Sequence, residues 1–108
     1  MRIFTILRSI RNNLRTNPIQ DNLERQEFRI LLNGDFATVE YKKIGNKSYD
    51  LIHAHIPDTY HGQGLGAILA ERVFDHIITN NSKMKISCEF LQRFLKSNND
   101  RYKMHVLE

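Results

Sequence analysis

The feature that most constrains the fold is a change of hydrophobic period around residues 57–64. Before Pro57, the side chains of residues 48–56 follow the two-residue alternation of a β-strand. After Gly64, apolar residues recur every three or four positions, which is the spacing of one helix face. These residues are Leu65, Ile68, Leu69, Val73 and Ile77. A strand followed closely by an amphipathic helix predicts an α/β domain.

The bulk composition supports one small globular domain. The chain has 108 residues, of which 41% are hydrophobic and 26% are charged. A chain of this length has room for little more than one domain. No stretch reaches the roughly 18 uninterrupted apolar residues of a transmembrane helix. The single cysteine excludes an internal disulfide.

Further strand patterns lie on both sides of the helix. They cover residues 28–32, 37–41, 48–56 and 83–88. Asn33-Gly34 is a tight hairpin signal between the first two, so the first three strands predict an antiparallel meander. We therefore expect a mostly antiparallel sheet of about four strands, a central amphipathic helix and a short C-terminal helix. In the third strand, alternation places Leu51 on the same face as His53 and His55.

The N-terminal segment, residues 1–22, differs from the body, residues 23–108. It carries four arginines against one aspartate, whereas the body carries twelve basic and eleven acidic residues. Its apolar residues Ile3, Leu7, Ile10 and Leu14 share one helix face. An Arg-rich amphipathic N-terminus is typical of a mitochondrial transit peptide. The alternatives are an ordinary helix that packs on the domain or a helix lying on a membrane surface. Without targeting by this segment, the expected location is the cytoplasm.

The loop His61-Gly-Gln-Gly-Leu-Gly66 is the strongest chemical signal. Glycines at every second position let backbone N–H groups approach an anion, and the helix dipole favours negative charge there. The Walker and Rossmann spacings are both absent. From the loop alone, a pyrophosphate site and a simple helix cap both remain open.

Several separated motifs resemble the GNAT acetyltransferases, and in particular their very small N-acetyltransferase domain-containing group. The matching stretches are Ala37–Tyr41, His53-Ala-His-Ile-Pro57, the glycine loop with Leu69-Ala70, and Ile86-Ser87-Cys88. The resemblance covers about residues 27–104. Position 61 departs from it, because His61 stands where the family motif prefers Arg or Gln.

The resemblance implies a cofactor, acetyl-coenzyme A, and a set of residues that bind it. The backbone amides of Gly62, Gln63, Gly64, Leu65 and Gly66 would hold the pyrophosphate beside His61. The backbone of Ala54, His55 and Ile56 would pair with the pantetheine arm. The cofactor would lie where the strands ending near Ile56 and Cys88 separate.

Two side chains are the candidate catalytic residues. His53 has an intrinsic pKa suited to a general base for an amine acceptor. Cys88 is either a covalent relay or a small buried residue. Tyr41 and Tyr60 are interpreted as packing and loop residues. The predicted function is N-acetyl transfer to a small-molecule or protein amine.

Other interpretations stay open. A non-catalytic acyl-coenzyme A binder or sensor would use the same loop without a base. A metal site built from His53, His55, His61 and Cys88 is a weaker alternative, since no compact ligand pair supports it. Nucleic-acid binding is not expected from a nearly neutral body. A homodimer would add buried area to so small a domain.

Overall fold

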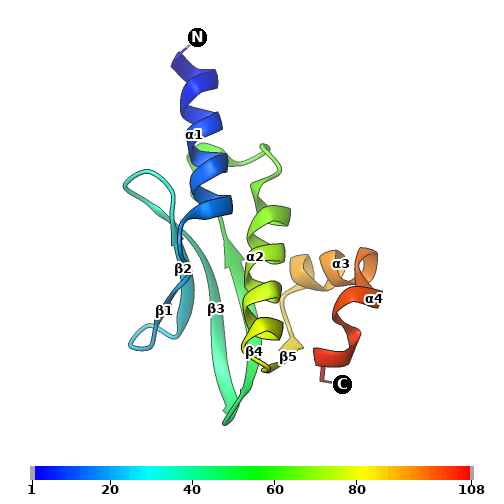
Figure 1. Cartoon of the computed structure of the whole chain (residues 1–108). Helices are drawn as coiled ribbons and strands as arrows, with labels where there is room; N and C mark the ends of the chain where they lie inside the picture. Colours follow the sequence, from blue (N-terminus) through cyan, green and yellow to red (C-terminus); the bar gives the residue numbers. More distant parts are fainter. Residues whose placement is uncertain (1, 108) are drawn as a thin grey trace.

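The computed structural model describes residues 2–107, with side chains from Leu7 onward. It is an α/β fold built on one five-stranded sheet with strand order β1-β2-β3-β4-β5 (Figure 1). The strands are β1 (Gln20–Asn22), β2 (Glu27–Leu31), β3 (Phe36–Gly45), β4 (Ser48–His55) and β5 (Lys83–Ile86). The first four form an antiparallel meander, and β5 joins β4 in parallel. The predicted meander is confirmed, and the short β1 is an addition.

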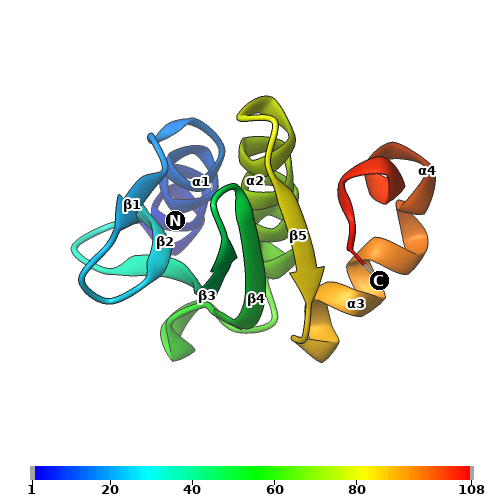
Figure 2. The same ribbon diagram turned by 90° about the horizontal axis from the view of Figure 1, so that it is seen from below.

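The helices divide between one face of the sheet and one of its edges. They are α1 (Arg2–Thr16), α2 (Leu65–Thr79), α3 (Glu89–Ser97) and α4 (Asn99–Tyr102), with 3₁₀ turns at Asp58–Tyr60 and Lys103–His105. α1 and α2 lie side by side over the sheet, and α3 and α4 lie beyond β5 (Figure 2). The opposite face of β2, β3 and β4, called the outer face below, is covered by none of the described helices (Figure 2).

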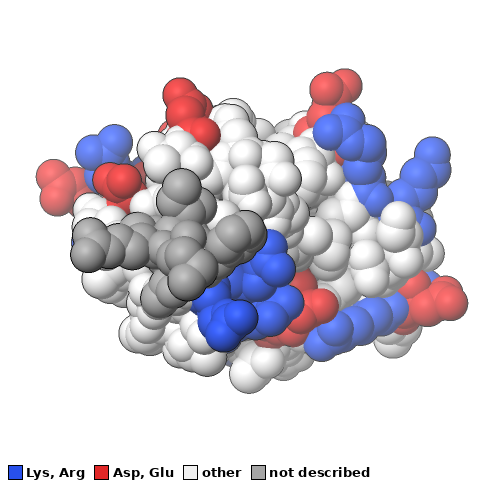
Figure 3. Space-filling view, turned by 90° about the horizontal axis from the view of Figure 1, so that it is seen from above, with Lys and Arg blue, Asp and Glu red and all other residues white. Residues whose placement is uncertain are grey.

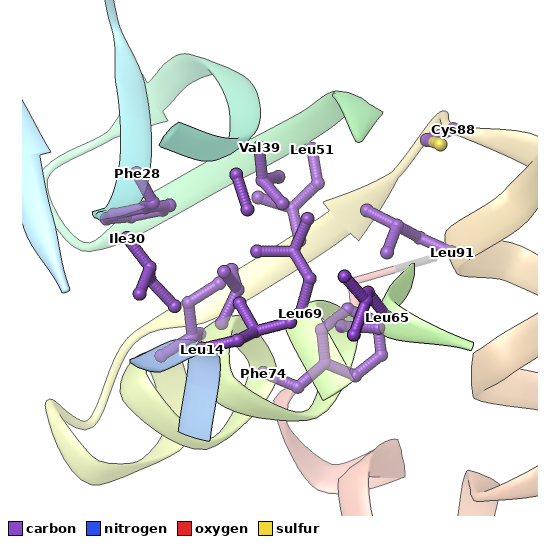
Figure 4. Packing of buried hydrophobic residues seen from close by; sticks show 14 of the residues in the cluster. Leu14, Phe28, Ile30, Val39, Leu51, Leu65, Leu69, Phe74, Cys88 and Leu91 are labelled. Carbon is purple, nitrogen blue, oxygen red and sulfur yellow. The ribbon is translucent and has the colours of Figure 1, made fainter. Parts of the chain in front are cut away.

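The main core lies between the sheet and the helices α1 and α2 (Figure 4). α2 contributes a fully buried stripe at helical spacing: Leu69, Ala70, Val73 and Phe74. These side chains meet inward-facing residues of β2, β3 and β4 that include Phe28, Ile30, Val39 and Leu51 (Figure 4). The predicted change of period at residues 57–64 is therefore a real boundary between strand and helix.

A β-bulge in β4 overturns one expectation from alternation. Glu40 pairs with His53 but Tyr41 pairs with Leu51, so Ile52 is an extra residue on β4. The extra residue shifts the alternation by one position. Leu51 is fully buried, whereas Ile52 is 45% exposed. The prediction that Leu51 shares a face with His53 and His55 is therefore wrong.

The C-terminal part of the chain also differs in detail from its sequence pattern. β5 ends at Ile86, two residues earlier than predicted, and Cys88 is the N-cap residue of α3. The polar tail folds back so that Tyr102 is fully buried, and its hydroxyl donates to Asp75 Oδ1 at 3.0 Å. Burial and that carboxylate raise the pKa of Tyr102.

The N-terminal helix is anchored in the same core. Ile10 and Leu14 of α1 are fully buried. Arg72 of α2 donates to the carbonyl oxygens of Leu14 at 2.5 Å and Asn17 at 2.7 Å, which satisfies acceptors at the end of α1. Residues 1–22 thus include part of the packed domain. In the part of the chain that is described, no helix is long and apolar enough to span a membrane.

Candidate functional site

The glycine loop forms a cradle of backbone amides at the start of α2. Gly62 and Gly64 have φ angles of 81° and 74°, in the left-handed region that favours glycine. None of the backbone N–H groups of residues 62–66 donates a hydrogen bond to another described residue. These donors lie at the positive end of the α2 dipole. The cradle is therefore suited to bind an anionic group.

A cavity of about 460 Å³ opens directly onto this cradle. Its walls include Ala54 of β4, Ile56 just after that strand, Tyr60 from the following turn, and Phe90 from α3. A Cβ atom added to Gly62 or Gly64 would meet nothing within 4 Å, so both glycines face open space. The cavity joins an apolar wall to a polar backbone floor, which suits a ligand with an apolar arm and an anionic group.

The cavity lies where β4 and β5 separate. Their parallel ladder runs from Ser48 opposite Lys83 to Leu51 opposite Ile86 and stops there. The amides of Ser87 and Cys88 then both donate to Leu51 O at 3.0 Å, which turns the chain away from β4. The last residues of β4, 52–55, have no ladder partner on the β5 side among the described residues. That free edge can accept an extended ligand as an added strand.

His61 lines the cavity, but its ring is turned back toward Ile56, the residue that follows β4. Its Nε2 forms a 2.6 Å hydrogen bond with Ile56 O and lies 3.5 Å from Asp58 Oδ1. The ring is thus already engaged beside the cradle.

A guanidinium from another element reaches the loop instead. Arg11 of α1 donates from Nη2 to Gln63 O at 2.8 Å. The sequence contained no local signal for this contact, because 52 residues separate its partners.

His53 and His55 lie on the outer face of the sheet, with ring centroids 6.5 Å apart. They line a surface depression of about 390 Å³ together with Thr38 and Glu40 of β3. Glu40 is the direct cross-strand partner of His53. The structure therefore separates these imidazoles from the wall that faces the glycine cradle.

Cys88 lies at the other side of the gap between β4 and β5. Its side chain is at the edge of the apolar cluster, where the chain passes from β5 into α3 (Figure 4). The residue is 8% exposed. Cys88 does not line the cavity that contains the cradle, and it does not line the depression that contains His53.

The two tyrosines considered from the sequence have different places. Tyr60 is buried and forms part of the cavity wall. Tyr41 lies in the core, where its hydroxyl donates to Asp21 Oδ1 at 2.6 Å, and burial raises its pKa. Phe90 of α3 also lines the cavity, and the sequence pattern did not indicate this role. Its ring lies so close to Gly66 that an added Cβ would stand 2.7 Å from Cζ.

The four residues of the metal alternative lie at separate places: His53 and His55 line the outer depression, His61 lines the cavity, and Cys88 lines neither. Within the described residues, no group of three or more His, Cys, Asp or Glu side chains could hold a metal ion. His53 and His55 point to the outer face while Cys88 lies at the turn into α3, so these candidate ligands do not converge.

Comparison with known proteins decides the family. Residues 27–105 match the model of the GCN5-related N-acetyltransferases. The chain belongs to the GCN5-related N-acetyltransferase (GNAT) family. The GNAT resemblance inferred from the motifs is therefore confirmed.

Relatives of similar size support the GNAT assignment. Protein NATD1 of Homo sapiens is 30% identical over 82 residues, covering 74% of this chain and 73% of the relative. Protein NATD1 of Danio rerio is 32% identical over 82 residues, with 74% of each chain covered. A GCN5-like protein from Staphylococcus aureus, solved by NMR, superposes with a TM-score of 0.59 at 29% identity, covering 88% and 89% of the two chains. The GNAT match begins at residue 27, so α1 and β1 lie outside it.

Proposed function

We propose that the chain is an acetyl-coenzyme A-dependent N-acetyltransferase that acts on an amine. The observation that carries the proposal is the junction of three features: a cradle of amides with no hydrogen-bond partner among the described residues, a cavity, and a gap between β4 and β5. The cradle suits the pyrophosphate of acetyl-coenzyme A, and the cavity with the free edge of β4 suits its pantetheine arm. Membership of the GNAT family supports this reading of the site.

The cradle and the free edge of β4 would bind the donor. The amides of residues 62–66 would donate to the pyrophosphate, where the α2 dipole adds favourable potential. The unpaired edge of β4 around Ala54 would hydrogen-bond the amides of the pantetheine arm. The carbonyl oxygen of Ile56 already accepts a hydrogen bond from His61. The pairing of this strand with the pantetheine arm would therefore end at His55, one residue earlier than the resemblance implied. Acetyl-coenzyme A, when bound, supplies an activated thioester carbonyl.

The amine would approach from the outer face of the sheet. His53 and His55 are the imidazoles that face the depression there. At neutral pH an aliphatic amine is mostly protonated, and its ammonium form must lose a proton before the nitrogen can attack; a neutral imidazole can accept that proton. Glu40, directly opposite His53, would stabilise the imidazolium that forms. We therefore assign His53 as the base.

Cys88 remains the second catalytic candidate, on weaker geometric support. It lies just beyond the point where β5 leaves β4, at the N-terminal end of α3. Burial would protect its thiol from solvent. Cys88 lines neither the cavity at the cradle nor the depression at His53, which favours a packing role over a covalent one. Mutation of Cys88 distinguishes the two roles.

Activity assays on matched variants test the proposal. Wild-type protein is mixed with acetyl-coenzyme A and a panel of a polyamine, a lysine peptide and a peptide with a free N-terminus. His53→Ala should lower turnover by about 10²–10⁴-fold, the usual contribution of a general base. His55→Ala is the control, since His55 lies on the same exposed face of the same strand. Cys88→Ala should leave turnover unchanged if the thiol only packs.

The outcomes separate the two candidate functions. Turnover that depends on His53 supports the transferase. Coenzyme binding without turnover on any amine would instead indicate the acyl-coenzyme A binder or sensor. Absence of coenzyme binding would overturn both.

The buried part of α1 bears on localisation. Removing residues 1–22 would take Ile10 and Leu14 out of the core. We therefore propose that the folded enzyme retains α1, and that any mitochondrial targeting by this helix occurs without cleavage after residue 22. A C-terminal fluorescent fusion and sequencing of the mature N-terminus test this. A mitochondrial protein that begins near residue 23 would refute it.

A further inference from the structure

We propose that Arg11 on the N-terminal helix is a ligand of the coenzyme's pyrophosphate. This inference rests on the proposed function, because it adds a residue to that same site. It concerns an element that the family match, residues 27–105, does not cover.

The first observation is the position of the guanidinium. Arg11 Nη2 donates to Gln63 O at 2.8 Å, and Gln63 lies between the two cradle glycines with left-handed backbone, Gly62 and Gly64. A guanidinium has five N–H donors in a planar fork, and this bond uses one. The remaining donors lie beside the loop, whose own amides have no partner in the described part of the chain.

The second observation is charge. Arg11 is exposed and forms no ion pair with any described carboxylate. Asp58, the acidic residue of the adjoining turn, lies 3.5 Å from His61 Nε2. The end of the molecule that carries α1 shows a group of basic side chains on its surface (Figure 3). A fixed positive charge beside an amide cradle complements a pyrophosphate, and guanidinium groups bind phosphate oxygens in bidentate geometry.

The third observation is rigidity. α1 cannot swing freely, since Ile10 and Leu14 on either side of Arg11 are fully buried. Arg72 also binds the end of the helix through two carbonyl oxygens. Arg11 is therefore presented to the loop by packed structure, and this reduces the ordering cost of binding.

Together these contacts explain how the site can work with His61 at the first position of the loop motif. The imidazole is held by Ile56 O and is not a fixed charge. Arg11 places a permanent positive charge at the same loop from a different element. The positive charge that the arginine of the family motif would place in the loop is thus supplied here by Arg11 of α1.

Amide chemical-shift titrations of ¹⁵N-labelled full-length protein test the inference, because they detect micromolar and millimolar binding alike. The ligands are coenzyme A, 3′-dephospho-coenzyme A and pantetheine. Arg11→Gln should weaken coenzyme A and 3′-dephospho-coenzyme A alike by about tenfold or more. Pantetheine, which lacks phosphate, should bind Arg11→Gln and wild type equally.

Arg15→Gln is the matched control. It removes the same charge from an exposed position one turn along α1, where the side chain makes no hydrogen bond to the loop among the described residues. It should change coenzyme A affinity by less than about twofold. The ligand-free spectra report whether each variant is folded.

Each alternative outcome is informative. Unchanged coenzyme A binding by Arg11→Gln overturns the inference and leaves the proposed function standing. Equal losses in both variants indicate a general charge effect, and loss of pantetheine binding indicates that Arg11 only shapes the loop; both overturn it. An effect that disappears with 3′-dephospho-coenzyme A refutes the pyrophosphate assignment. Wild-type protein that binds no coenzyme A overturns the proposed function and this inference together.

Discussion

Three glycines with similar positive φ angles allow the cradle to be tested apart from stability. Gly34, Gly62 and Gly64 have φ angles of 79°, 81° and 74°, and a Cβ on any of them would meet nothing within 4 Å. Gly34 lies in the turn between β2 and β3, whereas Gly62 and Gly64 line the cavity. An alanine substitution therefore places a side chain on a residue with positive φ both inside the cavity and away from it.

The expected loss of stability follows from the backbone. Left-handed geometry costs a residue with a Cβ about 1–2 kcal/mol. Alanine also lowers the conformational entropy of the unfolded chain, which raises the free energy of unfolding by about 0.4–1 kcal/mol. Each alanine variant should thus lose about 1 kcal/mol, which corresponds to about 4–8 °C in the melting temperature of a domain this size. Urea unfolding without ligand measures this loss.

The binding affinities should differ between the variants. In Gly64→Ala and Gly62→Ala, the new methyl group occupies the open space in front of the amides. Loss of one charge-assisted hydrogen bond costs about 1.5–3 kcal/mol, or about 10–150-fold in dissociation constant. Gly34→Ala should bind coenzyme A like the wild type. Isothermal titration calorimetry that finds unchanged affinity for Gly64→Ala, or an equal loss for Gly34→Ala, would refute the assignment of the cradle.

Two further predictions concern the packed helices. Leu14→Ala should lower the free energy of unfolding by about 2–5 kcal/mol, because a fully buried leucine leaves a cavity; a loss below about 0.5 kcal/mol in urea unfolding would show that α1 is not part of the core. Burial lowers the pKa of His76, whose ring lies 5.3 Å from that of Phe28. The unfolded state then binds the proton more readily, so stability should fall as the pH drops below 6.5, the ordinary value for histidine. His76→Phe should flatten this dependence in unfolding curves between pH 7.5 and 5.5, and an unchanged slope would contradict the argument.

Local chemistry in the sequence determined much of the fold. The change of period at residues 57–64, the Asn33-Gly34 turn and the apolar stripe of α2 depend on neighbours a few positions away, so they were readable without tertiary structure. The glycine loop could be identified for the same reason, because glycines at these positions allow the positive φ angles that the loop adopts. The residues of several short motifs, together with their order, predicted the family that the comparison confirmed.

Contacts between distant segments decided the rest. The bulge at Ile52 depends on how β3 and β4 pair, and it moved Leu51 to the face opposite His53. The burial of Tyr102 depends on Asp75, 27 residues away. The approach of Arg11 to the loop depends on α1 docking beside α2. Periodicity reports which face a segment would bury, but only the packed chain determines which partner that face meets, because many partners offer similar apolar area. Composition therefore indicated a basic N-terminal helix, and tertiary packing placed one of its arginines at the glycine loop.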